Sequence, residues 1–400
     1  MRLGTSSIVV AAFVGPGTVL TCAAAGVEFG YALGWVLLFA TAATFVLQSF
    51  TASTGILAGQ GLGEALRNTL EGRVARAVAF GLVVLGLWVG TAAFETGNLL
   101  GAASGISALA NGGVPIRGLV VLIAVIAGII LLFDLRIIVR LFTVLVVLMS
   151  ILFVIGMMLA PVDWSAALSG LLVPSVPEGS LLTVIALLGT TIVTYNLFLH
   201  PSAAKAYWQD ADDRPSAWSR ELQGMALCLP IGGVISFSIL AAGATLFGTD
   251  AAADDVEAFT VLLEPVAGTA AQLCFGIGLF AAGITSAMTA PLAAAAGIRE
   301  IFGWSEDVTD WRYRLVWGSV ILTGLVFALG DWSPLAAIIA AQAANGLLLP
   351  LIAGFMLYLS LRQEVVYLPR WYYGLGIIVV LICAGLGGRT LWWVWTQVGV

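Results

Sequence analysis

The chain has 400 residues, of which 60% are hydrophobic and only 10% are charged, and its net charge is −6. Soluble globular domains carry about 25% charged residues, so this composition excludes a soluble domain and indicates a protein that crosses a membrane several times. The first apolar stretch runs from Ile8 to about Tyr31. It is too long for a removable signal peptide, so we expect it to remain as the first helix.

Apolar stretches of about 20 residues are long enough to cross the hydrocarbon core of a bilayer. In chain order, the sequence predicts about eleven such helices, over residues 7–30, 33–57, 77–108, 116–134, 138–160, 181–206, 221–247, 261–296, 312–330, 334–361 and 372–391. The polar stretches between them are too short to fold alone. We therefore expect a single, all-α transmembrane domain over residues 1–400, embedded in the lipid bilayer.

The basic residues predict how these helices are oriented. Of the 16 Lys and Arg residues, only Arg117 and Arg389 fall on the side opposite the N-terminus. The other 14 are Arg2, Arg67, Arg73, Arg76, Arg136, Arg140, Lys205, Arg214, Arg220, Arg299, Arg312, Arg314, Arg362 and Arg370. Cytoplasmic loops carry an excess of Lys and Arg, and one missed helix would scramble this bias. We therefore expect a protein of the plasma (inner) membrane with a cytoplasmic N-terminus and an external C-terminus.

The first predicted helix contains Gly15-Pro16-Gly17-Thr18 inside its apolar stretch. A proline removes one amide hydrogen bond, and glycines let the chain leave the helical conformation. Unpaired backbone groups are costly in lipid unless they are buried in protein or line a cavity. This segment is therefore either a proline kink packed against its neighbours or a break that builds a binding site.

The sixth predicted helix has a second polar segment, Thr194-Tyr195-Asn196, in the middle of its span. Two breaks five helices apart are typical of two five-helix repeats of inverted topology, which bind substrate between their broken helices. We predict that helices 1 and 6 are unwound near residues 15–18 and 193–196 and face each other. The repeats are expected over residues 1–160 and 181–361, with an extra helix over residues 372–391.

Several longer segments resemble one family of transporters. They are GPGTVLTCAAAGVEFGYALGWVLLF, which begins at Gly15, NLFLHPSA (196–203), GLFAAGITSAMTAPLAAAAGI (278–298) and AAQAANGLLLP (340–350). These segments make most of the chain similar to the Nramp divalent-metal transporters. The resemblance implies the LeuT-type fold, in which ten helices form two inverted halves and one extra helix follows. It also implies ion-coupled secondary active transport, that is, symport by alternating access.

The sequence departs from this family at the residues that hold the metal there. The family has Asp, Asn and Met as ligands, and Gly15, Thr18 and Val193 stand at those positions here. The carboxylate and the thioether suited to Mn²⁺ and Fe²⁺ are thus lost. Tyr195 replaces the first sixth-helix His of the family, and Ala92 replaces its proton-linked Asp. These departures imply an altered, larger substrate cavity and a protein that is not a typical Mn²⁺ or Fe²⁺ importer.

The candidate substrate-binding residues lie at the two breaks and on the helices expected to face them. They are Gly15, Gly17, Thr18, Asn98, Val193, Thr194, Tyr195, Asn196, Gln342 and Asn345. Of these, Gln342 stands where the resemblance implicates a residue in substrate binding. Whether the site binds a metal is left open by the sequence.

Four residues are candidates for ion coupling. Glu95 is a carboxylate in mid-span with Asn98 on the same helix face, so it is expected to load the coupling proton; a structural hydrogen-bond anchor is the alternative. His200, the only histidine, is a candidate for proton passage or a structural group. Thr285 and Ser286 form a possible sodium site, with packing of small residues as the other interpretation.

The sequence leaves three functions open. The first is a carrier of a hard cation such as Mg²⁺, which needs only oxygen ligands. The second is a carrier of an amino acid or another small polar organic solute, whose carboxylate binds bare amides at half-helix N-termini. The third is a non-transporting sensor that retained the fold.

For a carrier, we expect H⁺ or Na⁺ as the coupling ion. We expect no cofactor and no nucleic-acid partner. We also expect no enzyme activity, because the sequence shows neither a nucleophile with a base nor a cofactor-binding loop.

Overall fold

The computed structural model is all-helical over the residues that it describes, which are 5–110, 113–133, 135–248, 256–305, 307, 309–330, 334–362 and 368–398. Its helices are α1 (Ser6–Phe13), α2 (Pro16–Phe29), α3 (Gly34–Ile56), α4 (Leu62–Thr69), α5 (Arg73–Leu109), α6 (Ile116–Ile130), α7 (Leu135–Leu159), α8 (Trp164–Leu172), α9 (Leu181–Thr191), α10 (Thr194–Tyr207), α11 (Arg214–Ala244), α12 (Val256–Phe302), α13 (Trp311–Ala328), α14 (Pro334–Arg362) and α15 (Arg370–Val398).

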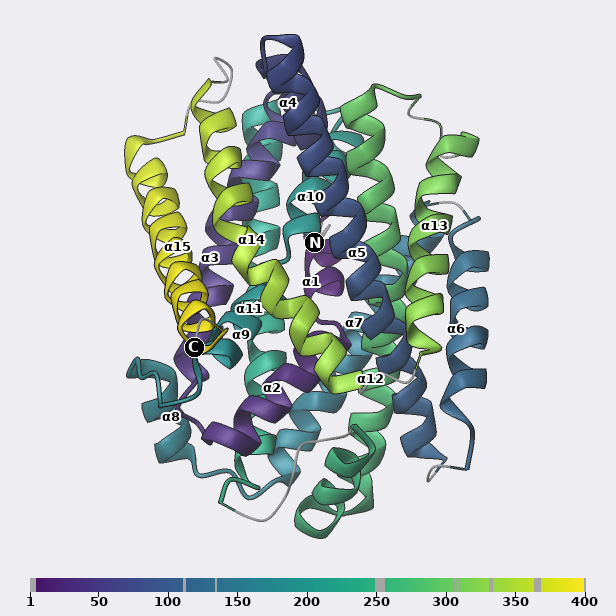
Figure 1. The fold of residues 1–400 in the computed structure, drawn as a ribbon, viewed down its shortest axis with the longest axis vertical. Coiled ribbons are helices and arrows are strands. Elements are labelled where there is room, and N and C mark those ends of the chain that lie inside the picture. The colour runs from purple at the N-terminus through teal and green to yellow at the C-terminus, as the bar shows by residue number, and fades with distance from the viewer. Residues whose placement is uncertain are drawn as a thin grey trace.

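Each predicted membrane span contains one helix or two in the structure. Seven of the described helices are long and apolar enough to cross a membrane, and Ile116–Ile130 and Leu349–Leu361 are shorter apolar helices. The apolar pattern does not predict α4 and α8, which are short and lie in the connections at 57–77 and 160–181. Figure 1 shows α4 and α8 at opposite ends of the bundle. Their separation agrees with the predicted spans, which put these two connections on opposite sides of the membrane.

The first and sixth predicted spans are each broken into two helices. In the first span, α1 ends at Phe13 and α2 begins at Pro16. In the sixth span, α9 ends at Thr191 and α10 begins at Thr194. Both breaks are shorter than predicted, because the segments 16–18 and 194–196 already form the first turns of α2 and α10.

The two breaks have similar backbone conformations. Val14 and Ile192 leave the helices with ψ angles of 72° and 77°, and Gly15 and Val193 after them are extended. In the first break the helix restarts at Pro16, where a missing N–H and a fixed φ suit the first helical position. Matching breaks five spans apart are the pattern of an inverted-repeat bundle.

Small residues let the helices that carry the breaks pack closely. Gly26 of α2 lies so near α11 that a Cβ there would stand 2.7 Å from the Ala244 amide nitrogen, and Gly243 of α11 lies against α2 in turn. Gly189 of α9 lies against the backbone of α14 at Gln342. Interfaces of small residues are typical of helices in membranes, where close packing drives association. They fix the positions of α2 and α9, and hence of both breaks.

Basic residues from distant parts of the chain gather at the end of the bundle that carries α4, which we call the basic end. Lys205 Nζ lies 3.0 Å from Glu64 Oε2. Arg67 donates to a carbonyl in the last turn of α12 at 3.0 Å, and Arg214 donates to the last residue of α3 at 2.8 Å. The predicted cytoplasmic connections thus meet at one end, although Arg2 lies outside the described residues. That the basic end is the cytoplasmic one stays a prediction.

Candidate substrate site between the broken helices

The two breaks face each other across a small cavity that has room for about one water molecule. Its lining comes from both halves of the two broken helices and from α5, α12 and α14, and consists of Ala12, Phe13, Gly15, Gly17, Thr18, Phe94, Asn98, Thr190, Val193, Tyr195, Ser286 and Gln342. A second gap, too narrow for a water molecule, shares Gly17, Asn98 and Gln342 with this cavity. Most of the predicted substrate residues therefore lie together, around one cavity.

The backbone carbonyls freed at the first break already have hydrogen-bond donors. The Thr18 hydroxyl donates to the carbonyl of Phe13 and also meets the Thr190 hydroxyl. The Tyr195 hydroxyl donates to the carbonyl of Ala12 at 3.1 Å. These two hydrogen bonds connect α1, the first half of the broken first span, to α2 and α10 across the cavity.

Asn345 of α14 forms hydrogen bonds with the backbone groups that are freed at the second break. Its Nδ2 donates to the carbonyls of Gly189 at 2.6 Å and Ile192 at 3.2 Å. Its Oδ1 accepts from the amide of Thr194 at 3.3 Å and from the hydroxyl at 2.5 Å. Asn196 donates to a carbonyl of α1 at 3.2 Å. These three predicted substrate residues hold the broken helices in place and do not line the cavity.

Side chains fill the space that the glycines leave. A Cβ at Gly15 would stand 2.5 Å from Ser286 Oγ, and a Cβ at Gly17 would overlap the amide of Gln342. The remaining cavity has room for about one water molecule. In this conformation two polar side chains, from α12 and α14, take up the room that the glycines leave, and the enlarged cavity stays a prediction.

Two buried oxygen atoms in the lining of the cavity have no hydrogen-bond partner. Among the described lining residues, Ser286 Oγ and Gln342 Oε1 are buried without a hydrogen-bond partner, and none of these residues carries sulfur or a basic group. A buried polar atom left without a partner costs about 1–3 kcal/mol. Oxygens in this state suit a ligand that is a cation or that brings hydrogen-bond donors.

Glu95 lies behind the cavity rather than in it. Phe94 and Asn98 of α5 line the cavity, whereas Glu95 packs against α13, where a Cβ at Gly324 would stand 2.6 Å from Glu95 Cγ. The carboxylate is fully buried, with one oxygen 3.4 Å from Asn98 Nδ2 and the other unpaired. The hydrogen bond to Asn98 therefore links Glu95 to the lining of the cavity.

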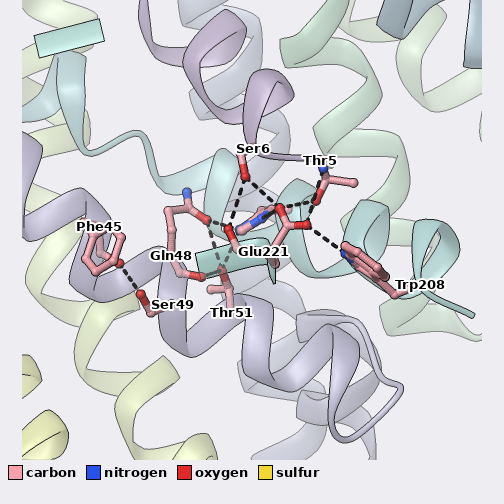
Figure 2. A network of polar contacts seen from close by, with 9 residues as sticks. Thr5, Ser6, Phe45, Gln48, Ser49, Thr51, Trp208 and Glu221 are labelled. Atoms are coloured by element: carbon pink, nitrogen blue, oxygen red, sulfur yellow. Dashed lines mark hydrogen bonds and ion pairs between the residues drawn. The ribbon is translucent and has the colours of Figure 1, made fainter. Parts of the chain in front are cut away.

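His200 belongs to a second polar cluster, which lies nearer the basic end. Figure 2 shows this cluster around Glu221, with Gln48 and Trp208 labelled. Its Nδ1 is 2.9 Å from Gln48 Oε1, and its Nε2 is 3.3 Å from Glu221 Oε1. Glu221 also accepts from the indole of Trp208 at 2.8 Å. The side chains of His200 and Glu221 are both fully buried. The structure thus separates His200 from the residues that line the cavity.

The two hydroxyls of the possible sodium site have different surroundings. Thr285 donates to the carbonyls of Ala281 at 3.0 Å and Ala282 at 2.9 Å, within its own helix. Ser286 faces the cavity between the breaks. Only Ser286 is therefore placed where an ion between the broken helices would contact it.

Sequence reasoning missed Thr190 as a lining residue and Glu221 as the partner of His200. Thr190 precedes the second break by less than one helical turn, so its position gave a usable signal. Glu221 is the first residue of the predicted span 221–247, where a carboxylate is expected to be solvated. The structure starts α11 at Arg214, which places Glu221 two turns inside the helix and buries it.

Two broken helices that enclose a buried polar site define a membrane transporter of the LeuT type. The family model described as "Natural resistance-associated macrophage protein-like" (Nramp) matches residues 6–393. The chain therefore belongs to the Nramp family.

Individual proteins are similar to this chain in sequence or in fold. The divalent metal cation transporter MntH of Acidiphilium cryptum is 27% identical over 372 residues, which cover 90% of this chain and 82% of that protein. The manganese transporter of Eremococcus coleocola, solved with an aromatic bis-isothiourea compound, superposes with a TM-score of 0.78 at 20% identity, over 96% of this chain and 85% of that chain. The nucleobase-cation-symport-1 family transporter Mhp1 superposes with a TM-score of 0.63 at 15% identity, over 98% and 92% of the two chains. The two structural likenesses show the fold alone.

Proposed function

We propose that the chain is a secondary active transporter of a hard cation, such as Mg²⁺, and not a typical importer of Mn²⁺ or Fe²⁺. The observation that carries this proposal is the pair of unpaired oxygens, Ser286 Oγ and Gln342 Oε1, in a cavity whose described lining has no sulfur. Hard cations bind oxygen ligands, whereas a thioether suits the softer transition metals. Relatives named as divalent metal cation transporters support a cation as substrate.

One carboxylate is placed to balance the charge of the cation. Gly15 and Val193 bring no charge to the cavity, but Glu95 is bonded to Asn98, which lines it. We propose that Glu95 also loads and releases the coupling proton, since an ionisable group inside a membrane protein is a functional candidate by default. A sodium ion that contacts Ser286 is the alternative for coupling.

A carrier of an amino acid or another small polar solute is the second candidate. Both α2 and α10 begin at the breaks, so two half-helix N-termini lie near the cavity, as carboxylate binding requires. Room for about one water molecule and a described lining without basic side chains favour an ion over such a solute.

The predicted orientation is part of the proposal. The N-terminus is placed in the cytoplasm and the C-terminus outside, in the plasma (inner) membrane. The repeats are placed at residues 1–160 and 181–361, and the extra helix at 372–391. The support is the bias of basic residues and their gathering at the basic end.

Uptake into proteoliposomes tests the substrate. Mg²⁺, Mn²⁺, Ca²⁺, Na⁺ and a mixture of amino acids are offered singly and in competition, with and without a proton gradient. We expect Mg²⁺ uptake that Mn²⁺ inhibits poorly. Ser286→Ala should reduce this uptake at least about tenfold, because a ligand oxygen is lost.

The matched control is Thr289→Val, one turn further along α12. The Thr289 hydroxyl donates only to carbonyls of its own helix, at 2.9 Å and 3.3 Å, so this variant should transport like the wild type. Uptake of amino acids with no uptake of Mg²⁺ would replace the first candidate with the second.

A further inference from the structure

The short helix α8 exposes an apolar face and a polar face side by side. Large apolar side chains recur at every fourth residue, and Trp164, Leu168 and Leu172 are 54%, 57% and 61% exposed. Ser165 and Ser169 each follow one of them by one position, so they lie about 100° further round the helix, and both are exposed. The sequence of the helix, WSAALSGLL, contains no charged residue. Such faces are typical of a helix that lies at the boundary between an apolar and a polar phase.

The remaining face of α8 is fixed to the turn between α2 and α3. Gly170 lies so close to this turn that a Cβ there would collide with the carbonyl of Tyr31. The Tyr31 hydroxyl accepts from the amide of Asp163, just before α8, at 3.1 Å. The carbonyl of Ser175, after α8, accepts from the Trp35 indole at 2.7 Å. Contacts before, within and after α8 thus hold it against the turn.

α8 lies at the rim of the bundle. Figure 1 shows it at the edge of the bundle, at the end opposite α4. Its neighbour α3 is long and apolar enough to cross a membrane, and Leu38 on α3 is 49% exposed. Because Trp35 belongs to the first turn of α3, α8 lies where this span leaves the bilayer.

We propose that α8 is an interfacial helix, which embeds Trp164, Leu168 and Leu172 in the lipid leaflet at the end opposite the basic end. Its serines then face the water, and the turn between α2 and α3 is held at the membrane surface. Interfacial helices bury their apolar face about 5–10 Å into the boundary between headgroups and acyl chains, and tryptophan is enriched at that depth. Since α2 runs from the cavity to this turn, the lipid contact fixes one end of the first broken span.

A lipid leaflet fits this face better than a second copy of the chain. Three large apolar side chains side by side form a patch of the kind that marks a binding surface. A stable protein–protein interface involves about 20–30 residues on each side, far more than this face offers. Lipid covers the outer side of α3 next to α8, so one leaflet can cover both surfaces without a further partner.

Spin labels at two neighbouring residues test the insertion in the full-length protein in liposomes. Leu168→Cys and Ser169→Cys are each labelled with a nitroxide in a Cys274→Ala background, since the other three cysteines are buried. Collisions with oxygen, which concentrates in lipid, and with a water-soluble nickel complex report the surroundings of each label. We expect the ratio of the two collision rates to be at least about fivefold higher at residue 168 than at residue 169, because an interfacial helix places one face in lipid and the other in water.

Equal ratios at the two positions would overturn the proposal, since water or protein would then surround both faces. Exclusion of both reagents from residue 168, together with magnetic coupling between the labels of two copies, would also overturn it and assign the face to a dimer. Trp164→Cys repeats the test on the same face if Leu168→Cys folds poorly, and it should give the same high ratio.

Hydrogen–deuterium exchange tests whether the insertion holds the turn. In Trp164→Ser combined with Leu168→Ser, exchange of residues 30–35 in liposomes should rise at least about threefold, because local opening becomes easier. Ser169→Ala keeps the apolar face and should exchange like the wild type. Unchanged exchange in the double variant would refute the part of the proposal that concerns the turn. These measurements need no substrate and do not depend on which end is cytoplasmic, so their outcome is independent of the proposed function.

Discussion

Replacing Asn345 by Leu should destabilise the broken sixth span and abolish transport. The side chain donates to the carbonyls of Gly189 and Ile192, at 2.6 Å and 3.2 Å, and accepts from the amide and hydroxyl of Thr194. Leu keeps the approximate volume but offers no polar atom. A buried carbonyl without a partner costs about 1–3 kcal/mol, so two of them should lower the free energy of unfolding by roughly 2–6 kcal/mol.

Unfolding of the purified protein in mixed micelles, followed by tryptophan fluorescence, measures this loss. The matched control is Ser360→Ala on the same helix, because Ser360 donates only to the carbonyl of Met356 in its own turn, at 3.0 Å. A side-chain hydrogen bond within a membrane protein contributes about 0.6 kcal/mol on average, so the control should change little. Equal, small changes in both variants would refute the idea that Asn345 holds the second break.

Three further predictions concern the site. Glu95→Gln should bind the cation with an affinity within about threefold of wild type but lose substrate-driven proton flux, since the amide cannot titrate. A pH-sensitive dye inside liposomes measures this flux, and an unchanged flux would leave Glu95 as a structural anchor. Gly17→Leu should abolish uptake while the protein still folds, because its side chain needs the space that the Gln342 amide occupies; uptake near wild type would show that the cavity lies elsewhere. Gly15→Asp combined with Val193→Met should raise the affinity for Mn²⁺ at least about tenfold in calorimetry, since a carboxylate and a thioether are restored. An unchanged affinity for Mn²⁺ would contradict the ligand assignment.

The membrane spans could be predicted from their long apolar stretches, and the first break from a proline between two glycines. The second break could be predicted from the polar segment at residues 194–196, five spans further on. The short helices α4 and α8 could not, because both are too short to cross a membrane and so leave no signal of a span. The orientation of the Glu95 side chain could not be predicted either. A helical pattern shows that Glu95 and Asn98 share a face, but only the packing of α13 at Gly324 turns the carboxylate away from the cavity.

The pairing of His200 with Glu221 could not be predicted from the sequence either. The two residues lie on different helices, and one of them stood at the predicted edge of a span, where a charged residue is usually solvated. The burial of Glu221 follows from where α11 begins, which the loss of apolar character before residue 221 concealed.

The most direct test of the account is calorimetric titration of the purified wild-type protein with Mg²⁺ and with Mn²⁺ under the same conditions. The account predicts that Mg²⁺ binds and that Mn²⁺ binds weakly, because the described cavity offers oxygen ligands without sulfur and without a carboxylate at Gly15. A submicromolar affinity for Mn²⁺, together with no detectable binding of Mg²⁺, would contradict it.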